Sequence, residues 1–157
     1  MKKKKVVVIS LLLLLVSVIG ISSYFLFKDK INLLDVDHSA VDWNGKKQKD
    51  TSGEENTIAI PGFEKVTLYA NETKQAVNFH NPEINDCYFK ISLIHPDGSV
   101  LWISDLIEPG KGMYSIELEQ TLAVGEYENA VLKYECFSLN DQSPLNGSEI
   151  NLKLVVV

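Results

Sequence analysis

The sequence predicts an all-β domain carried behind a single N-terminal transmembrane helix. The first observation is that Val6 to Phe27 form a run of 22 residues without a charge, preceded by four lysines. The second is that, from Thr57 onward, apolar and polar residues alternate in short runs. Turn residues separate these runs every 8–12 positions, which is typical of a β-sandwich or barrel. No amphipathic helix of useful length interrupts this second region.

The apolar run has the length of a membrane span. Twenty-two helical residues cover roughly 33 Å, and the hydrocarbon core of a bilayer is about 30 Å thick. A cleaved signal peptide ending near residues 20–22 is the alternative, but Tyr24 and Phe25 continue the apolar run beyond it and suit a membrane interface. We therefore favour a retained anchor. Because Lys2 to Lys5 hold the N-terminus in the cytoplasm, we expect a single-pass cell-membrane protein with residues 28–157 outside.

Three parts follow along the chain. Residues 1–27 form the predicted transmembrane signal-anchor, residues 28–56 a flexible polar linker, and residues 57–157 the extracytoplasmic β-sandwich domain. The linker prediction depends on residues 45–56, which contain no apolar side chain and cannot offset the entropy cost of ordering. A coil as long as the linker has a root-mean-square span of roughly 30 Å. The domain should therefore stay close to the membrane.

The charge of the β domain excludes one class of partner. Residues 57–157 hold six lysines against fourteen Asp and Glu, a formal net charge of 6 − 14 = −8. Such a domain repels phosphate backbones, so nucleic acid is not expected as a partner. The chain contains no arginine beside its fifteen lysines, a bias that is compatible with a low-GC Gram-positive source.

Turn residues divide the domain into about 7–8 short strands. Pro61-Gly62 and Asn81-Pro82 end two early strands. Pro96-Asp97-Gly98-Ser99 has the chemistry of a tight hairpin turn, since Pro presets φ and Gly tolerates positive φ. Pro109-Gly110 and Asn146-Gly147 mark later turns. The strands expected between these signals cover residues 57–60, 66–70, 75–80, 86–94, 100–103, 114–118, 126–139 and 149–157.

Three of these strands alternate regularly enough for their inner faces to be assigned. Successive side chains of a strand point to opposite faces of the sheet, so apolar residues two apart share a face. The predicted inner faces are those of Cys87, Phe89, Ile91 and Leu93, of Ala130, Leu132, Tyr134 and Cys136, and of Ile150, Leu152, Leu154 and Val156.

A short motif before the longest strand adds a resemblance. Leu122-x-x-Gly125-x-Tyr127 resembles the tyrosine corner of immunoglobulin-like domains. Residues 57–157 also resemble small membrane-anchored surface proteins of Gram-positive bacteria. This resemblance implies an immunoglobulin-like antiparallel β-sandwich and brings no catalytic residue with it. The buried Trp of antibody domains is not reproduced, because Phe89 stands near its expected position. The recurring features of these surface proteins appear as Ile60-Pro61-Gly62-Phe63, Asn81-Pro82, Ile107-Glu108-Pro109-Gly110 and Gly125-Glu126-Tyr127.

The two cysteines are disulfide candidates. If the domain is immunoglobulin-like, the strands at 86–94 and 126–139 are antiparallel neighbours. Cys87 and Cys136 then lie at the same end of one sheet and point inward, where a disulfide is geometrically possible. Two buried free thiols are the alternative. No histidine lies beside either cysteine in sequence or register, so neither is expected to be catalytic.

Two surface features are candidate binding sites. On three strands that should share a sheet, four side chains alternate with the inward residues and so point outward. They form a candidate partner face and are Tyr88, Lys90, Lys133 and Lys153. An ordinary solvated sheet surface is the alternative. Trp102 and Tyr114 are a candidate aromatic platform for a sugar ring, and the alternative is a tryptophan packed in the core.

The predicted function is a non-enzymatic one. No motif for nucleophilic catalysis, metal binding or nucleotide binding appears, so we expect no catalytic residue, metal ligand or cofactor. Besides the bilayer contacted by residues 6–27, the expected partner is another envelope protein. The chain would act as a protein-binding accessory subunit of a cell-envelope, surface or secretion assembly. The alternative is a carbohydrate-binding module for cell-wall glycan, which needs Trp102 and a tyrosine exposed together.

Overall fold

The computed structural model describes residues 33–45 and 57–157, and its β domain is one unit from Leu34 to Val157. These ranges contain strands and no helix, and thus no helix that could cross a membrane. The predicted anchor over residues 1–27 lies outside the described part of the chain.

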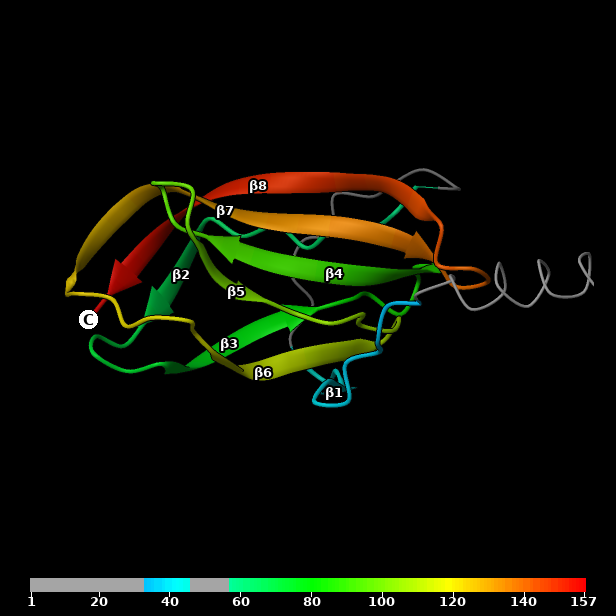
Figure 1. Cartoon of the computed structure of the whole chain (residues 1–157), viewed down its shortest axis with the longest axis horizontal. Coiled ribbons are helices and arrows are strands. Elements are labelled where there is room, and N and C mark those ends of the chain that lie inside the picture. The colour runs from blue at the N-terminus through cyan, green and yellow to red at the C-terminus, as the bar shows by residue number, and fades with distance from the viewer. Residues whose placement is uncertain (1–32, 46–56) are drawn as a thin grey trace, which may run out of the picture. The chain divides into compact units, whose positions relative to one another are not determined.

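The all-β prediction is confirmed for the described residues. The strands form a three-stranded sheet in the order β1-β6-β3 and a five-stranded sheet in the order β2-β8-β7-β4-β5. Figure 1 shows β8, β7 and β4 side by side in one layer and β3 and β6 in the other. All neighbours are antiparallel except β2, which runs parallel to β8. The strands are β1 (Val41–Asp42), β2 (Lys65–Leu68), β3 (Lys74–His80), β4 (Cys87–Ile94), β5 (Val100–Ile103), β6 (Lys111–Glu117), β7 (Gly125–Ser138) and β8 (Pro144–Val156).

The predicted inner faces of β4, β7 and β8 form one side of the core. All four predicted residues of β4 and of β7 are buried, as are Leu152, Leu154 and Val156, while Ile150 is partly buried against them. Residues of the three-stranded sheet close the other side. The ring of Phe79 on β3, for example, lies 5.9 Å from the ring of Trp102 on β5, centroid to centroid. The period-two pattern therefore predicted these faces correctly.

The expected turn at Asn146-Gly147 is wrong, because both residues lie inside β8. The pairing slips there, from Tyr134 opposite Ser148 to Cys136 opposite Leu145, so β8 carries an additional residue as a β-bulge. A Cβ on Gly147 would lie 2.2 Å from the carbonyl oxygen of Tyr134. The glycine thus permits a close approach of two backbones.

The strand expected over residues 57–60 is also absent. Ala59 is instead held by the side chain of Asn85, whose Oδ1 accepts from the Ala59 N–H at 2.7 Å. The Asn85 Nδ2 donates to the Ala59 carbonyl at 2.9 Å. One buried side-chain amide therefore satisfies the backbone groups that a neighbouring strand would otherwise pair.

The flexible linker predicted over residues 28–56 is wrong for residues 34–45, which we call the clasp. The clasp packs on the β domain: the Asp37 N–H donates to the Leu106 carbonyl at 2.8 Å, and the Leu106 N–H donates to the Asp35 carbonyl at 2.9 Å. Val41 and Asp42 then form β1 against β6. The remainder of the predicted linker, residues 28–32 and 46–56, lies outside the described residues.

Trp43 fixes the end of the clasp across the three-stranded sheet. Its ring stacks on His80 with centroids 3.8 Å apart and an interplanar angle of 9°. Its Nε1 donates to Oδ1 of Asn78 at 2.7 Å. The indole also lies against Gly112 of β6, where a Cβ would be 2.7 Å from the Trp43 Cδ1. The packing of Trp43 thus adds to the backbone pairing that holds the clasp on the sheet.

Replacing Gly112 by alanine is expected to displace Trp43 from the sheet. The new methyl group would also approach the His80 Cβ and the Phe79 carbonyl oxygen to 3.0 Å. We expect a loss of about 1–3 kcal/mol in the free energy of unfolding and a red shift of tryptophan emission. Both can be measured by urea titration of the full chain in detergent micelles.

Gly62→Ala is the matched control for this variant, because no atom lies within 4 Å of a Cβ placed at Gly62. Trp43→Phe identifies the tryptophan that reports the change, since Trp102 remains in that variant. Unchanged emission in Gly112→Ala would contradict the packing described for the clasp.

Candidate protein-binding face on the five-stranded sheet

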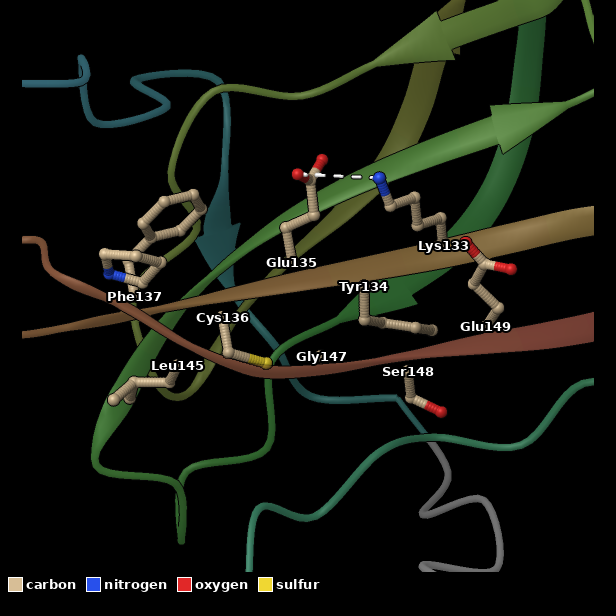
Figure 2. Close-up of a pocket in the computed structure, with 10 residues that line it drawn as sticks. Lys133, Tyr134, Glu135, Cys136, Phe137, Leu145, Gly147, Ser148 and Glu149 are labelled. Atoms are coloured by element: carbon tan, nitrogen blue, oxygen red, sulfur yellow. Dashed lines mark ion pairs between the residues drawn. The ribbon is translucent and has the colours of Figure 1, made fainter.

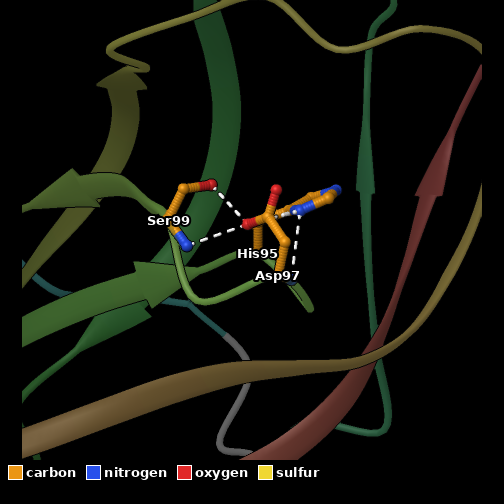
Figure 3. A network of polar contacts seen from close by, with 3 residues as sticks. All are labelled: His95, Asp97 and Ser99. Atoms are coloured by element: carbon orange, nitrogen blue, oxygen red, sulfur yellow. Dashed lines mark hydrogen bonds and ion pairs between the residues drawn. The ribbon is translucent and has the colours of Figure 1, made fainter.

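His95, Asp97 and Ser99 are the residue types of a catalytic triad and contact one another, but their geometry is that of a turn. In Figure 3, both Ser99 and His95 converge on the Asp97 carboxylate. The Ser99 N–H and Oγ donate to Asp97 Oδ1 at 2.8 and 2.7 Å, and the His95 Nδ1 lies 3.0 Å from the same oxygen. In a triad the serine hydroxyl donates to the histidine instead.

The electrostatics of this cluster agree with a structural role. Hydrogen bonds from the Ser99 side chain and backbone, and then from His95, lower the pKa of Asp97 to about 2. The carboxylate is therefore charged and braces the turn between β4 and β5, where Gly98 has a φ of 89°. The turn predicted from Pro96-Asp97-Gly98-Ser99 is confirmed.

Buried amides form a second polar cluster, which pins loops together. The Asn81 Nδ2 donates to the carbonyls of Cys87 and Ile107 at 2.8 and 2.9 Å. Its Oδ1 accepts from the Asn85 Nδ2 at 2.8 Å. Each polar atom of the Asn81 side chain is thus used within the fold. Across residues 33–45 and 57–157, no group of three or more His, Cys, Asp or Glu could hold a metal ion.

The candidate partner residues do share one surface, as predicted. Tyr88 and Lys90 on β4, Lys133 on β7 and Lys153 on β8 alternate with buried residues and are half-buried on the side of the five-stranded sheet away from the core. We call this surface the outer face. It consists of Tyr88, Lys90, Ile94, Val131, Lys133, Glu135, Phe137, Lys153 and Val155.

Apolar pairs frame the outer face. Tyr88 lies directly opposite Phe137 across β4 and β7, and Ile94 lies directly opposite Val131. All four side chains are half-buried. Phe137 was missed from the sequence, although it has the same parity as Lys133 and extending the alternation by two positions would have found it. The two apolar pairs stand at either end of a polar middle row.

The lysines of the outer face lie close to carboxylates on it or beside it. Lys90 lies opposite Glu135, and the Lys133 Nζ is 3.6 Å from a Glu135 carboxylate oxygen. The Lys153 Nζ lies 2.6 Å from Glu126 and 2.9 Å from Glu128. Hydrogen bonds to these two carboxylates raise the pKa of Lys153. Lys133 and Lys153 are therefore each paired with a carboxylate, and Lys90 lies across the strands from one.

A groove of about 320 Å³ opens beside this row where β8 bulges. Figure 2 shows Lys133, Glu135 and Phe137 on one side of β7, with Tyr134 and Cys136 on the other. Glu149, opposite Lys133 on β8, also lines the groove. The absence of a side chain at Gly147 allows this local geometry, so the bulge shapes one end of the outer face.

The aromatic platform of Trp102 and Tyr114 is wrong. Trp102 is only 7% exposed and belongs to the five-stranded sheet. Tyr114 lies on β6 of the other sheet, where its Oη donates to the Asn44 Oδ1 and accepts from the Asn44 N–H, both at 2.9 Å. Parity could not orient Trp102, because all four residues of β5 are apolar.

The cysteines lie at one end of the sheet and point inward, as predicted. Cys136 is opposite Phe89, and Cys87 is opposite Ser138, so the two cysteines occupy diagonal positions. Both are buried free thiols in this structure. They contact each other: a hydrogen bond with Cys87, together with burial, raises the pKa of Cys136. The disulfide itself stays a prediction.

We expect this pair to be oxidised when the chain is recovered from an oxidising compartment. Denatured protein should then take up no maleimide without a reductant and two maleimides after reduction, as measured by intact mass. Cys87→Ser supplies the control, since it leaves one thiol that labels in denaturant alone. Two labels on the unreduced wild-type chain would contradict the disulfide.

Comparison with known proteins identifies no relative. No family model, curated protein or solved structure matches the chain.

Proposed function

We propose that this chain is a membrane-tethered, extracytoplasmic and non-enzymatic protein-binding module of a Gram-positive cell envelope. It would serve as an accessory subunit of a surface, envelope or secretion assembly. The observation that carries the proposal is the outer face, where Tyr88–Phe137 and Ile94–Val131 flank a row of paired charges. Apolar anchors with charge pairs around them suit recognition of a protein surface.

We further propose that the domain is immunoglobulin-like. The order β4-β7-β8 in one sheet and the adjacency of β3 and β6 in the other match the strand neighbours of that fold. The Tyr127 Oη donates to the Ala123 carbonyl at 2.9 Å, a bond back to the upstream backbone of the kind that a tyrosine corner makes. An experimental structure of the domain would test this assignment.

The polar clusters that could suggest catalysis are used within the fold. The Asp97 carboxylate braces a turn, and the Asn81 amide joins loops. The glycan-binding alternative required Trp102 to be exposed beside a tyrosine, and Trp102 is buried. Protein binding is therefore the function that we retain.

Site-specific photocrosslinking in native membranes tests the proposal. A photoreactive residue at position 90, on the outer face, should capture one dominant envelope protein, which mass spectrometry would identify. The same residue at Ser115, exposed on β6 of the other sheet, is the matched control. Equal capture at both positions, or capture at neither, would refute a specific partner on the outer face.

A further inference from the structure

The turn between β7 and β8 holds the point where the chain enters the β domain. Leu34 is the first residue of this domain. Its N–H donates to the Gln142 Oε1 at 2.6 Å, and the Gln142 Nε2 donates to the Leu34 carbonyl at 3.0 Å. The side-chain amide of Gln142 therefore pairs with both backbone groups of Leu34 and ties the entering chain to the turn.

This turn is braced internally. The Gln142 N–H donates to the Ser138 carbonyl at 3.0 Å, and the Ser138 N–H donates to the Ser143 carbonyl at 2.9 Å. Asp141 Oδ1 accepts from the Ser143 N–H at 3.1 Å. Gln142 itself adopts a φ of 56°. The side chains around the turn are therefore presented from an ordered support.

Three leucine side chains around this turn are exposed to solvent. Leu34, Leu139 and Leu145 are 36%, 38% and 44% exposed. We call these three leucines and residues 140–144 the tip. Apart from Asp141, the turn residues at the tip are uncharged. The tip thus combines an apolar rim with short polar side chains.

The length of the preceding chain determines what can cover the tip. The predicted membrane span ends at Phe27, and the seven residues from Lys28 to Leu34 reach at most about 25 Å when fully extended. The headgroup layer on one side of a bilayer occupies roughly 5–8 Å of that distance. Leu34, at the tip, is consequently held within about 25 Å of the end of the predicted span.

We propose that the tip contacts the headgroup layer of the membrane, with its leucines at the interface. This inference rests on the membrane anchoring in the proposed function. Uncharged or zwitterionic lipid is the fitting partner, because the exposed carboxylate of Asp141 gives the tip a negative charge. The outer face then extends away from the bilayer along β4 and β7, where it is open to a protein partner.

Lipid quenching of a fluorophore tests the contact in the full chain. Asn140→Cys, labelled with an environment-sensitive probe, is reconstituted in phosphatidylcholine vesicles that contain headgroup-proximal spin-labelled lipid. Val124→Cys is the matched control: it is exposed and adjoins the opposite end of β7. A 14-residue strand separates the two positions by roughly 45 Å. Cys87 and Cys136 are each 1% exposed, and mock-labelled wild-type chain corrects for any reaction with them.

The expected result is a blue shift and loss of emission for the probe at position 140 and neither change at position 124. Adding Leu139→Ser and Leu145→Ser to Asn140→Cys should reverse the blue shift and restore emission. Equal quenching at both ends, or at neither, overturns the inference. Flotation of the vesicles in alkaline carbonate separates the two proposals. A chain that floats without quenching at position 140 refutes only the tip contact, whereas a chain that does not float refutes the anchoring as well.

Discussion

Replacing Asn81 by alanine is expected to remove much of the stability of the β domain. The substitution deletes both donors to the Cys87 and Ile107 carbonyls and the acceptor for the Asn85 amide, all in a site that excludes water. Leaving a buried polar group unsatisfied costs about 1–3 kcal/mol. The Ile107 carbonyl still accepts from the Phe89 N–H, so two groups lose their partner. Two such groups imply a loss on the order of 2–6 kcal/mol, a large share of the stability of an ordinary domain.

Urea titration followed by circular dichroism measures this loss in the free energy of unfolding. Asn140→Ala is the control, because Asn140 is exposed in a turn and surface changes usually stay within about 0.5 kcal/mol. A loss below about 1 kcal/mol in Asn81→Ala would mean that water or a local shift satisfies the abandoned groups.

Replacing Gly147 by alanine is expected to have a comparable effect by a steric route. The added Cβ would stand 2.2 Å from the carbonyl oxygen of Tyr134 and 3.3 Å from its carbonyl carbon. These are backbone atoms in the middle of β7, so the clash cannot be relieved by rotating a side chain. We expect a loss of about 3 kcal/mol or more, together with weaker photocrosslinking from position 90, because the bulge shapes one end of the outer face.

Asn146→Ala is the control for this variant, since Asn146 is the exposed neighbour of Gly147 in the same bulge. Thermal unfolding measures the stability change, and crosslinking yield measures the effect on binding. A Gly147→Ala protein with wild-type unfolding would show that β7 and β8 can move apart at the bulge without cost.

Regular alternation is what made the five-stranded sheet predictable. β4, β7 and β8 are long enough for parity to assign both faces, so the buried residues and the outward lysines were identified together. β5 is four apolar residues long, and parity there carries no information, which is why Trp102 was placed wrongly. The predicted turn at Asn146-Gly147 failed because the same dipeptide also suits a bulge.

Contacts between distant parts of the chain could not be predicted from the sequence. The bond between Leu34 and Gln142 joins residues 108 positions apart, and neither residue has a local feature that marks the other. The clasp was missed for the same reason: Trp43 is ordered by His80 and Gly112, which belong to strands far along the chain. The average composition of residues 28–56 is that of a linker, and it does not show that Trp43 packs on the sheet.

The parallel pairing of β2 with β8 has a consequence for the order of assembly. β2 is the earliest strand of the five-stranded sheet in the sequence, and β8 is the last of the described strands. During synthesis, β2 cannot pair with β8 until every intervening strand has been synthesised, so one edge of β2 stays unpaired until then. Because β8 also pairs with β7, its arrival completes two ladders at once. Such distant pairing slows folding and prolongs exposure to aggregation, so we expect the chain to depend on chaperones until β8 is in place.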